Sequence, residues 1–302
     1  MKRFVKDIAW FVLPVVFLLL VGELYMRSIP NIYRYKDDWM QEHAGEVETL
    51  VLGNSHTFDG ISPSQMTGRV FNLAMPNQML EHDYFLLTRY ADGYKRLKRV
   101  IALVDECNIL LPELESLGFG DRSTYYRIYM GHDKHSRWSL YNFEISNLKT
   151  CYRKVARWWK TKREGGNLLG CDSLGFSPQG EQRRGGEGMD AQFMKGRWRK
   201  ASVVNRNVSY LVKIVKFCQE RGVELVLITM PYRDYYYNQL DNNTRLLVRN
   251  IGFKYSQRPG VRYIDFQAIS HMTDSDYIDN SHLKTSAAMR FSHELDSLLQ
   301  VK

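Results

Sequence analysis

Three residues in two short blocks have the types and spacing of a serine nucleophile with its base. Ser55 lies in the sequence GNSH at 53–56, directly after the apolar run 48–53. The glycine permits a tight strand-to-helix turn, which exposes the serine hydroxyl. Asp279 and His282 lie three positions apart near the C-terminus. At this spacing the carboxylate can accept the Nδ1 proton of the imidazole, so that Nε2 can act as the base for Ser55 in acyl transfer.

Each block alone also has a simpler structural interpretation. A Gly-x-Ser sequence is usually only a turn, and Asp279 and His282 could cap the next helix and lie on the surface. Their positions along the chain favour the chemical interpretation. Ser55 follows the first predicted strand and His282 follows the last, and ligands of open parallel sheets bind at the carboxyl ends of the strands.

Five short apolar runs, with helical patterns between them, predict the fold that positions these blocks. Each run is continuously apolar, as in strands that are buried on both faces. Alternating strands and helices predict an α/β domain of three layers, with a mostly parallel sheet between two layers of helices. The predicted strands are 48–53, 69–74, 99–104, 223–230 and 261–266, and the predicted helices are 80–90, 203–222 and 286–299.

The two blocks, in this order, resemble those of the SGNH/GDSL hydrolase family, and the resemblance covers about residues 48–299. It implies a flavodoxin-like parallel sheet of five strands in the order 2-1-3-4-5, with an acyl-enzyme on Ser55. More narrowly, His56, the Asp-x-x-His-Leu sequence and the apolar N-terminus resemble membrane-anchored SGNH proteins of bacterial surface-polysaccharide acylation. In those systems a multi-pass membrane-bound O-acyltransferase hands acyl groups outward.

The resemblance also implies donors for the oxyanion, in addition to the N–H of the nucleophile itself. Ala74 stands where the family has a glycine, and its backbone N–H can still donate. The family's asparagine has no single counterpart here. Asn108 after the third strand, and Asn77 or Gln78 after the second, are the candidates. His56 is a further candidate for donating to the oxyanion or binding substrate.

Length, charge and hydropathy restrict the class of protein. The chain has 302 residues, enough for one large α/β core. It carries 42 Lys and Arg against 33 Asp and Glu, a net charge of +9 that favours anionic partners. A mean hydropathy of −0.40 excludes a polytopic membrane protein.

One local segment departs from that average hydropathy. Residues 8–22 carry no charge, follow three basic residues, and extend as a mostly apolar stretch to residue 26. This predicts a single-pass membrane anchor over 1–27. A cleaved signal peptide is the alternative, but no small-x-small pair follows the apolar core. The basic N-terminus predicts a bacterial inner-membrane protein whose later residues are extracytoplasmic, although Arg27, Arg34 and Lys36 weaken that charge asymmetry.

After the anchor, we expect a linker over 28–47 and one α/β domain over 48–302. The domain is interrupted by a basic, glycine-rich insertion at about 151–200, with twelve Lys or Arg against five Asp or Glu. Such a composition cannot bury much apolar surface. The insertion is either a mobile surface segment or a flap beside the active site.

The remaining motifs are less specific. Four cysteines form no Cys-x-x-Cys pair, and they are either four free thiols or include a Cys151–Cys171 bridge. His132 and His135 lack companion ligands, so no metal is expected. A tyrosine cluster after the fourth strand, beside Arg233, could stack on sugar rings or belong to the core. Its members are Tyr232, Tyr235, Tyr236 and Tyr237.

Together, these patterns predict an extracytoplasmic serine esterase or O-acyltransferase acting on acylated cell-surface carbohydrate, with no metal or cofactor. The alternative is a non-catalytic accessory subunit of a membrane-bound O-acyltransferase complex. The lack of a single counterpart for the family's oxyanion asparagine favours this alternative. Nucleic acid is the least expected partner, because the basic insertion lies outside the cytoplasm if the segment 1–27 is an anchor.

Overall fold

The computed structural model describes residues 2–133, 139–183 and 200–301, which form two compact units. We call them the anchor unit and the sheet unit. The anchor unit comprises Met1–Asp37 and Leu114–Gly170, and the sheet unit comprises Asp38–Glu113 and Cys171–Lys302. All the predicted site residues belong to the sheet unit.

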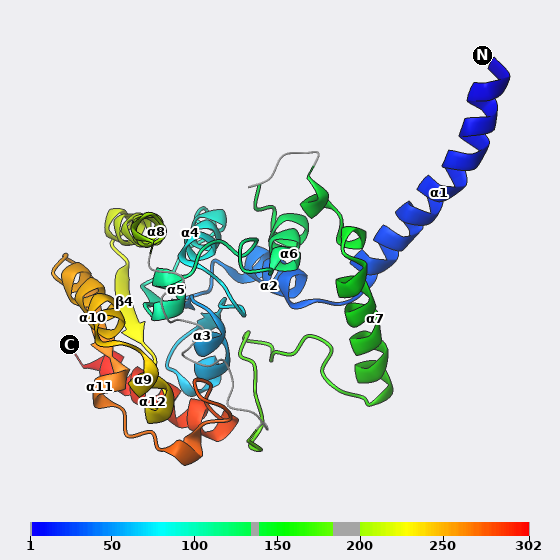
Figure 1. Cartoon of the computed structure of the whole chain (residues 1–302). Coiled ribbons are helices and arrows are strands. Elements are labelled where there is room, and N and C mark those ends of the chain that lie inside the picture. Colours follow the sequence, from blue (N-terminus) through cyan, green and yellow to red (C-terminus); the bar gives the residue numbers. More distant parts are fainter. Residues whose placement is uncertain (1, 134–138, 184–199, 302) are drawn as a thin grey trace. The chain divides into compact units, whose positions relative to one another are not determined.

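The sheet unit is built on five parallel strands in the order β2-β1-β3-β4-β5, of which Figure 1 labels β4. This confirms the predicted strand order. In the central strand pairings, Leu50 lies opposite Phe71 on one side and Val100 on the other. All three side chains are fully buried, as their continuously apolar runs predict. The strands are β1 Thr49–Val51, β2 Val70–Asn72, β3 Arg99–Leu103, β4 Glu224–Thr229 and β5 Val261–Asp265.

Helices cover both faces of the sheet, which confirms the predicted three-layer α/β fold. One layer is formed by helices that contact one another: α4 Leu80–Arg89, α5 Glu106–Leu110, α8 Ala201–Glu220 and α10 Asn242–Ser256. The other layer contains α3 Ser55–Gly60 packed on α12 Thr285–Gln300. The shorter elements are η1 Pro63–Gln65, α9 Asp234–Gln239, α11 Phe266–Ile269 and η5 Asp274–Asp276.

The anchor unit begins with α1, Lys2–Ser28, whose segment Lys6–Ser28 is long and apolar enough to cross a membrane. Near its end, Glu23 accepts hydrogen bonds from the backbone N–H groups of Glu144 and Ile145, at 3.2 and 3.1 Å. The other elements of this unit are α6 Gly120–Met130, η2 Leu140–Asn142, η3 Glu144–Ser146 and α7 Leu148–Arg163.

The predicted linker 28–47 contains a helix, α2 (Ile32–His43). Its residue Trp39 stacks on Phe71, with ring centroids 3.7 Å apart. Apolar contact of this kind explains why the segment is ordered despite its many polar residues.

The predicted insertion 151–200 divides into parts with different structures. Its first part continues α7, and its residues 184–199 lie outside the described part of the chain. Cys171 and Phe176, in between, are buried in the sheet unit, with 3% and 2% exposure. All four cysteines are free thiols, and Cys151 and Cys171 belong to different units.

Candidate active site

A glycine turn after β1 presents Ser55. Gly53 has φ +127°, and a Cβ atom there would lie 2.6 Å from Thr57 Oγ1 and 2.7 Å from Leu103 Cβ. Only glycine fits this backbone. Asn54 follows as the N-cap of α3, and its side chain accepts the N–H of His56 at 2.9 Å. Ser55 is therefore the first residue of α3.

The structure brings together the three residues of the two sequence blocks. His282 Nε2 lies 2.9 Å from Ser55 Oγ, and His282 Nδ1 lies 3.0 Å from both carboxylate oxygens of Asp279. Asp279 Oδ1 also accepts the backbone N–H groups of Ser281 and His282. The loop before α12 thus fixes both the carboxylate and the imidazole.

The environment of Asp279 keeps it ionised. Burial raises the pKa of Asp279, but the hydrogen bond and charge of His282, with the two backbone N–H groups, outweigh burial and lower it from 3.8 to about 2. An ionised Asp279 accepts the Nδ1 hydrogen of His282. Nε2 is then the acceptor that faces the hydroxyl of Ser55, as a general base requires.

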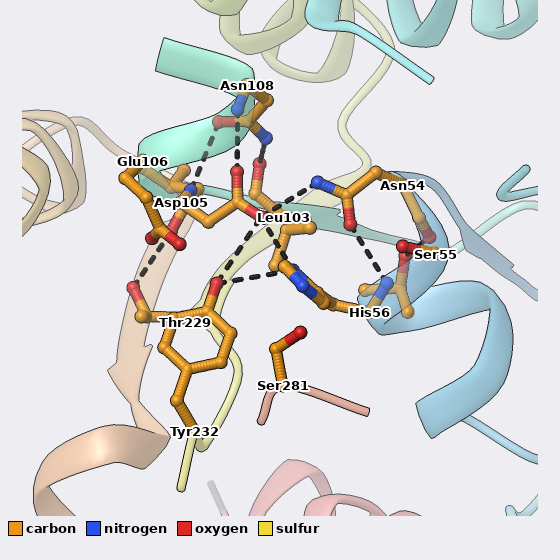
Figure 2. Close-up of polar contacts among 12 residues, drawn as sticks. Asn54, Ser55, His56, Leu103, Asp105, Glu106, Asn108, Thr229, Tyr232 and Ser281 are labelled. Atoms are coloured by element: carbon orange, nitrogen blue, oxygen red, sulfur yellow. Dashed lines mark hydrogen bonds and ion pairs between the residues drawn. The ribbon is translucent and has the colours of Figure 1, made fainter. Parts of the chain in front are cut away.

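A second imidazole–carboxylate pair lies beside the first, and its partners were not predicted. His56 Nδ1 lies 2.9 Å from Asp105 Oδ2, and the hydroxyl of Tyr232 lies 3.2 Å from the same nitrogen (Figure 2). Asn54 donates its amide hydrogen to Asp105 Oδ2 at 2.8 Å. The rings of His56 and His282 have centroids 5.1 Å apart.

Two of the predicted oxyanion donors are engaged elsewhere. The N–H of Ala74 donates to the side chain of Asn72 at 3.0 Å. The side chain of Asn108 caps α5: it accepts the N–H of Asp105 and donates to the carbonyl of Leu103. Figure 2 shows Asn108 and Ser55 on opposite sides of the cluster. The signal for this cap was in the sequence, because Asp-x-x-Asn is close to a capping box.

The segment after β2 holds the other two candidates. Gln78 donates to Asp83 Oδ1 at 2.6 Å, so it too is engaged. Asn77 has φ +59° in a turn closed by the N–H of Gln78 and the carbonyl of Met75, with Pro76 before it. Asparagine tolerates this conformation. Within the described part of the chain, the side-chain amide of Asn77 forms no hydrogen bond.

Two members of the tyrosine cluster are in the core rather than on a sugar-binding surface. Tyr232 and Tyr236 are 3% and 1% exposed. The hydroxyl of Tyr236 donates to Glu106 at 2.7 Å, and that of Tyr232 lies against His56. Only Tyr235 is largely exposed, at 47%. Tyr236 lies on the buried side of α9, Asp234–Gln239, and Tyr235 faces outward, whereas Tyr232 precedes this helix.

Residues 171–181 of the insertion form hydrogen bonds with the helices next to the site residues. The N–H of Ser177 donates to the carbonyl of Phe58 in α3, at 3.1 Å. Gly180 and Thr285, at the start of α12, exchange hydrogen bonds through the Gly180 carbonyl and the Thr285 hydroxyl. Residues 171–181 therefore connect α3, which begins with Ser55, to the helix that follows His282.

Asp83 supports the Gly53 turn and makes folding stability depend on pH. Its Oδ1 accepts the N–H of Gly53 at 3.0 Å, and burial raises the pKa of Asp83 from 3.8 to about 7. A folded-state pKa above the unfolded value gives stability that is full below about pH 4 and is lost as the pH rises to about 7. Over that interval, the deprotonation of Asp83 alone lowers the free energy of unfolding by about 4 kcal/mol.

We therefore expect the wild type to unfold at lower urea concentration at pH 8 than at pH 5, and Asp83→Asn to remove part of that difference. Burial raises the pKa of Glu106 to about 8, so Glu106 contributes the rest over the same pH range. The exposed Asp92→Asn variant controls for the change of net charge. Equal pH dependence in the wild type and Asp83→Asn would contradict this assignment.

Comparisons with known proteins add a distant likeness to solved structures. No protein-family model and no curated protein matches the chain. The chain is similar to a solved structure, provisionally identified as a platelet activating factor from Streptococcus pneumonia, with a TM-score of 0.44 and 11% sequence identity. The similarity covers 96% of this chain and 99% of that one.

Proposed function

We propose that this chain is an SGNH-type serine esterase or O-acyltransferase, with Ser55 as nucleophile, His282 as general base and Asp279 as the group that orients His282. The observation that carries the proposal is the continuous hydrogen-bond chain from Ser55 Oγ through the imidazole to the Asp279 carboxylate. A serine, a histidine and an aspartate that are hydrogen-bonded in this order can activate the serine hydroxyl for attack on an acyl carbonyl.

In the first half-reaction, Ser55 Oγ attacks the carbonyl carbon of an ester while its proton passes to His282 Nε2. The ester C–O bond then breaks, and His282 returns the proton to the leaving oxygen. Asp279 stabilises the imidazolium and stays ionised throughout. Water or the hydroxyl of an acceptor resolves the acyl-enzyme in the second half-reaction, by the same steps in reverse.

The oxyanion needs donors that are not already engaged. Within the described part of the chain, neither the N–H of Ser55 nor the side-chain amide of Asn77 has a hydrogen-bond partner. We assign the oxyanion to these two groups in place of Ala74 and Asn108. Each such donor contributes about 3 kcal/mol to the stability of the transition state.

We further propose that the substrate is acylated surface carbohydrate and that the sheet unit is extracytoplasmic, attached to the bacterial inner membrane through α1. Two features support this. Segment Lys6–Ser28 has the length and hydropathy of a membrane span. The net charge of +9 attracts acidic polymers and the anionic surface of a bilayer. A multi-pass membrane-bound O-acyltransferase would then be the natural acyl donor.

A non-catalytic accessory subunit is the second candidate function. The engagement of Ala74 N–H and of the Asn108 side chain favours it, because both were expected to stabilise the oxyanion. In that case the chain keeps the fold and binds polymer or a membrane partner without forming an acyl-enzyme.

Labelling by a fluorophosphonate probe distinguishes the two candidates. We expect the full chain in detergent to be labelled, and labelling to be lost in Ser55→Ala and in His282→Ala. Ser64→Ala, which changes an exposed serine, is the matched control and should label as the wild type does. Absence of labelling in a folded wild type would favour the accessory subunit.

A further inference from the structure

His56 is a buried histidine with one nitrogen still available. Its side chain is 4% exposed, and Nδ1 is held by Asp105 and Tyr232. Within the described part of the chain, Nε2 of His56 forms no hydrogen bond. Figure 2 shows the ring of His56 between Asp105, with its hydrogen-bond partners, and the start of α3, which carries Ser55.

The hydrogen bonds around Asp105 assign the tautomer of His56. Asp105 Oδ1 accepts the backbone N–H of Asn108 at 2.7 Å, and Oδ2 accepts the amide of Asn54 at 2.8 Å. Neither donor can act as an acceptor, so Asp105 presents lone pairs to its neighbours. The hydrogen shared with His56 therefore lies on Nδ1, and Nε2 carries a lone pair.

A neutral ring in this tautomer accepts a hydrogen bond and does not donate one at Nε2. Burial lowers the pKa of His56, and this outweighs the hydrogen bond and charge of Asp105, so the ring is neutral at pH 7. His56 is thus unsuited to stabilise an oxyanion, a role that the sequence left open for it. Its chemistry fits a ligand with an O–H donor.

The position of His56 indicates which O–H group this is. The rings of His56 and His282 lie 5.1 Å apart between centroids, and each is oriented by a carboxylate at Nδ1. An acceptor hydroxyl that attacks the acyl-enzyme must donate its hydrogen to His282 Nε2. A second hydroxyl on the adjacent carbon can then donate to the lone pair of His56.

We propose that His56 is an acceptor-binding residue, whose Nε2 accepts a hydrogen bond from the hydroxyl next to the one that attacks. The site would then select acceptors with two neighbouring hydroxyls, as in sugars and other polyols. This inference rests on the proposed acyl-enzyme at Ser55.

The step balances without a proton on His56. The attacking oxygen forms a bond to the acyl carbon, and its proton passes to His282 Nε2. The bond between the acyl carbon and Ser55 Oγ breaks, and His282 returns the proton to Oγ. His56 keeps its lone pair on the second hydroxyl throughout, so it binds and orients the acceptor.

The test compares two acceptors of nearly equal size. Ethylene glycol and 1-propanol differ by a hydroxyl in place of a methyl group. The full chain in detergent receives acetyl groups from p-nitrophenyl acetate, and the two product esters are measured by gas chromatography. We expect the wild type to form the glycol ester at least about tenfold faster per molar acceptor, since one hydrogen bond is gained. A wild-type ratio near one would overturn the proposal.

Variants at His56 and Tyr232 then show whether the preference for ethylene glycol depends on His56 Nε2. His56→Asn keeps a donor for Asp105 but removes the Nε2 acceptor, and we expect its ratio to fall to about one. His56→Phe is the second such variant, in case His56→Asn does not fold, and the wild-type ratio decides the question if neither does. Tyr232→Phe removes the hydroxyl at Nδ1 and keeps Nε2, so its ratio should stay high. A ratio unchanged in a folded His56 variant overturns the proposal.

A separate result marks failure of the proposed function itself. If Ser55 forms no acyl-enzyme, the wild type will give neither p-nitrophenol release nor fluorophosphonate labelling. If labelling and release occur without a diol preference, only the role of His56 fails.

Discussion

The His282→Ala variant is expected to hydrolyse p-nitrophenyl acetate at least about 10⁴-fold more slowly than the wild type, measured as kcat/KM. His282 Nε2 is the group bonded to Ser55 Oγ, at 2.9 Å, within the described part of the chain. Without it, the serine hydroxyl is an unactivated alcohol. Urea unfolding should change little, because the His282 side chain is 22% exposed and packs less tightly than the core.

Asp279→Asn is the companion variant, because it leaves His282 in place but favours the wrong tautomer. We expect a loss of about 10⁴-fold in kcat. The pKa of about 2 predicts that Asp279 stays ionised at every pH where the protein is assayed, so the wild type should show no acid limb from this carboxylate above about pH 3. Near-normal rates in either variant, with the fold intact, would exclude this arrangement as the source of activity.

Gly53→Ala is expected to lower the free energy of unfolding by about 3 to 5 kcal/mol and to abolish fluorophosphonate labelling. Two effects add. The φ of +127° is strained for any residue with a Cβ atom, and that atom would lie 2.6 Å from Thr57 Oγ1 and 2.7 Å from Leu103 Cβ. To accommodate alanine, the turn that presents Ser55 must move.

Gly260→Ala is the matched control for this change. Gly260 has φ +74°, but a Cβ atom there meets nothing within 4 Å. It therefore carries the backbone strain without the clash, and we expect a loss of about 1 kcal/mol with labelling retained. Urea midpoints of the full chain measure both variants. Equal losses for the two glycines would mean that the close approach at Gly53 has no energetic weight.

The sequence was sufficient for the sheet and for the apolar helix α1, but insufficient for the rest of the anchor unit. Strands buried on both faces have to be continuously apolar, so the runs that became β1 to β4 were visible without any partner. Strand β5 lies at the edge of the sheet and is only partly buried, with Arg262 and Asp265 in its run. Helix α10 was also visible in principle: Asp241 caps it, and Val248, Ile251 and Tyr255 repeat on one buried side. In contrast, α7 carries apolar side chains at helical spacing, such as Tyr152, Val155 and Trp159, but buries none of its residues, so its pattern does not reveal what it packs against.

The same contrast applies to the site. The contact among Ser55, His282 and Asp279 was predictable because each block combines its residue types with a local turn signal. Asp105 and His56 lie 49 positions apart, and neither is part of a recognisable pair in the sequence. Their pairing depends on the register of β1 against β3, which only the folded sheet fixes.

The separation of Ser55 and His282 by 227 positions has a consequence for biosynthesis. A ribosome therefore makes Ser55 long before it makes His282. Until α12 packs on α3, the nascent chain carries an ordinary serine and cannot be acylated by esters in its surroundings. If Ser55 is the proposed nucleophile and the chain is exported from its N-terminus onward, its reactivity arises only after the segment that carries His282 has crossed, so cytosolic thioesters would not meet an activated serine.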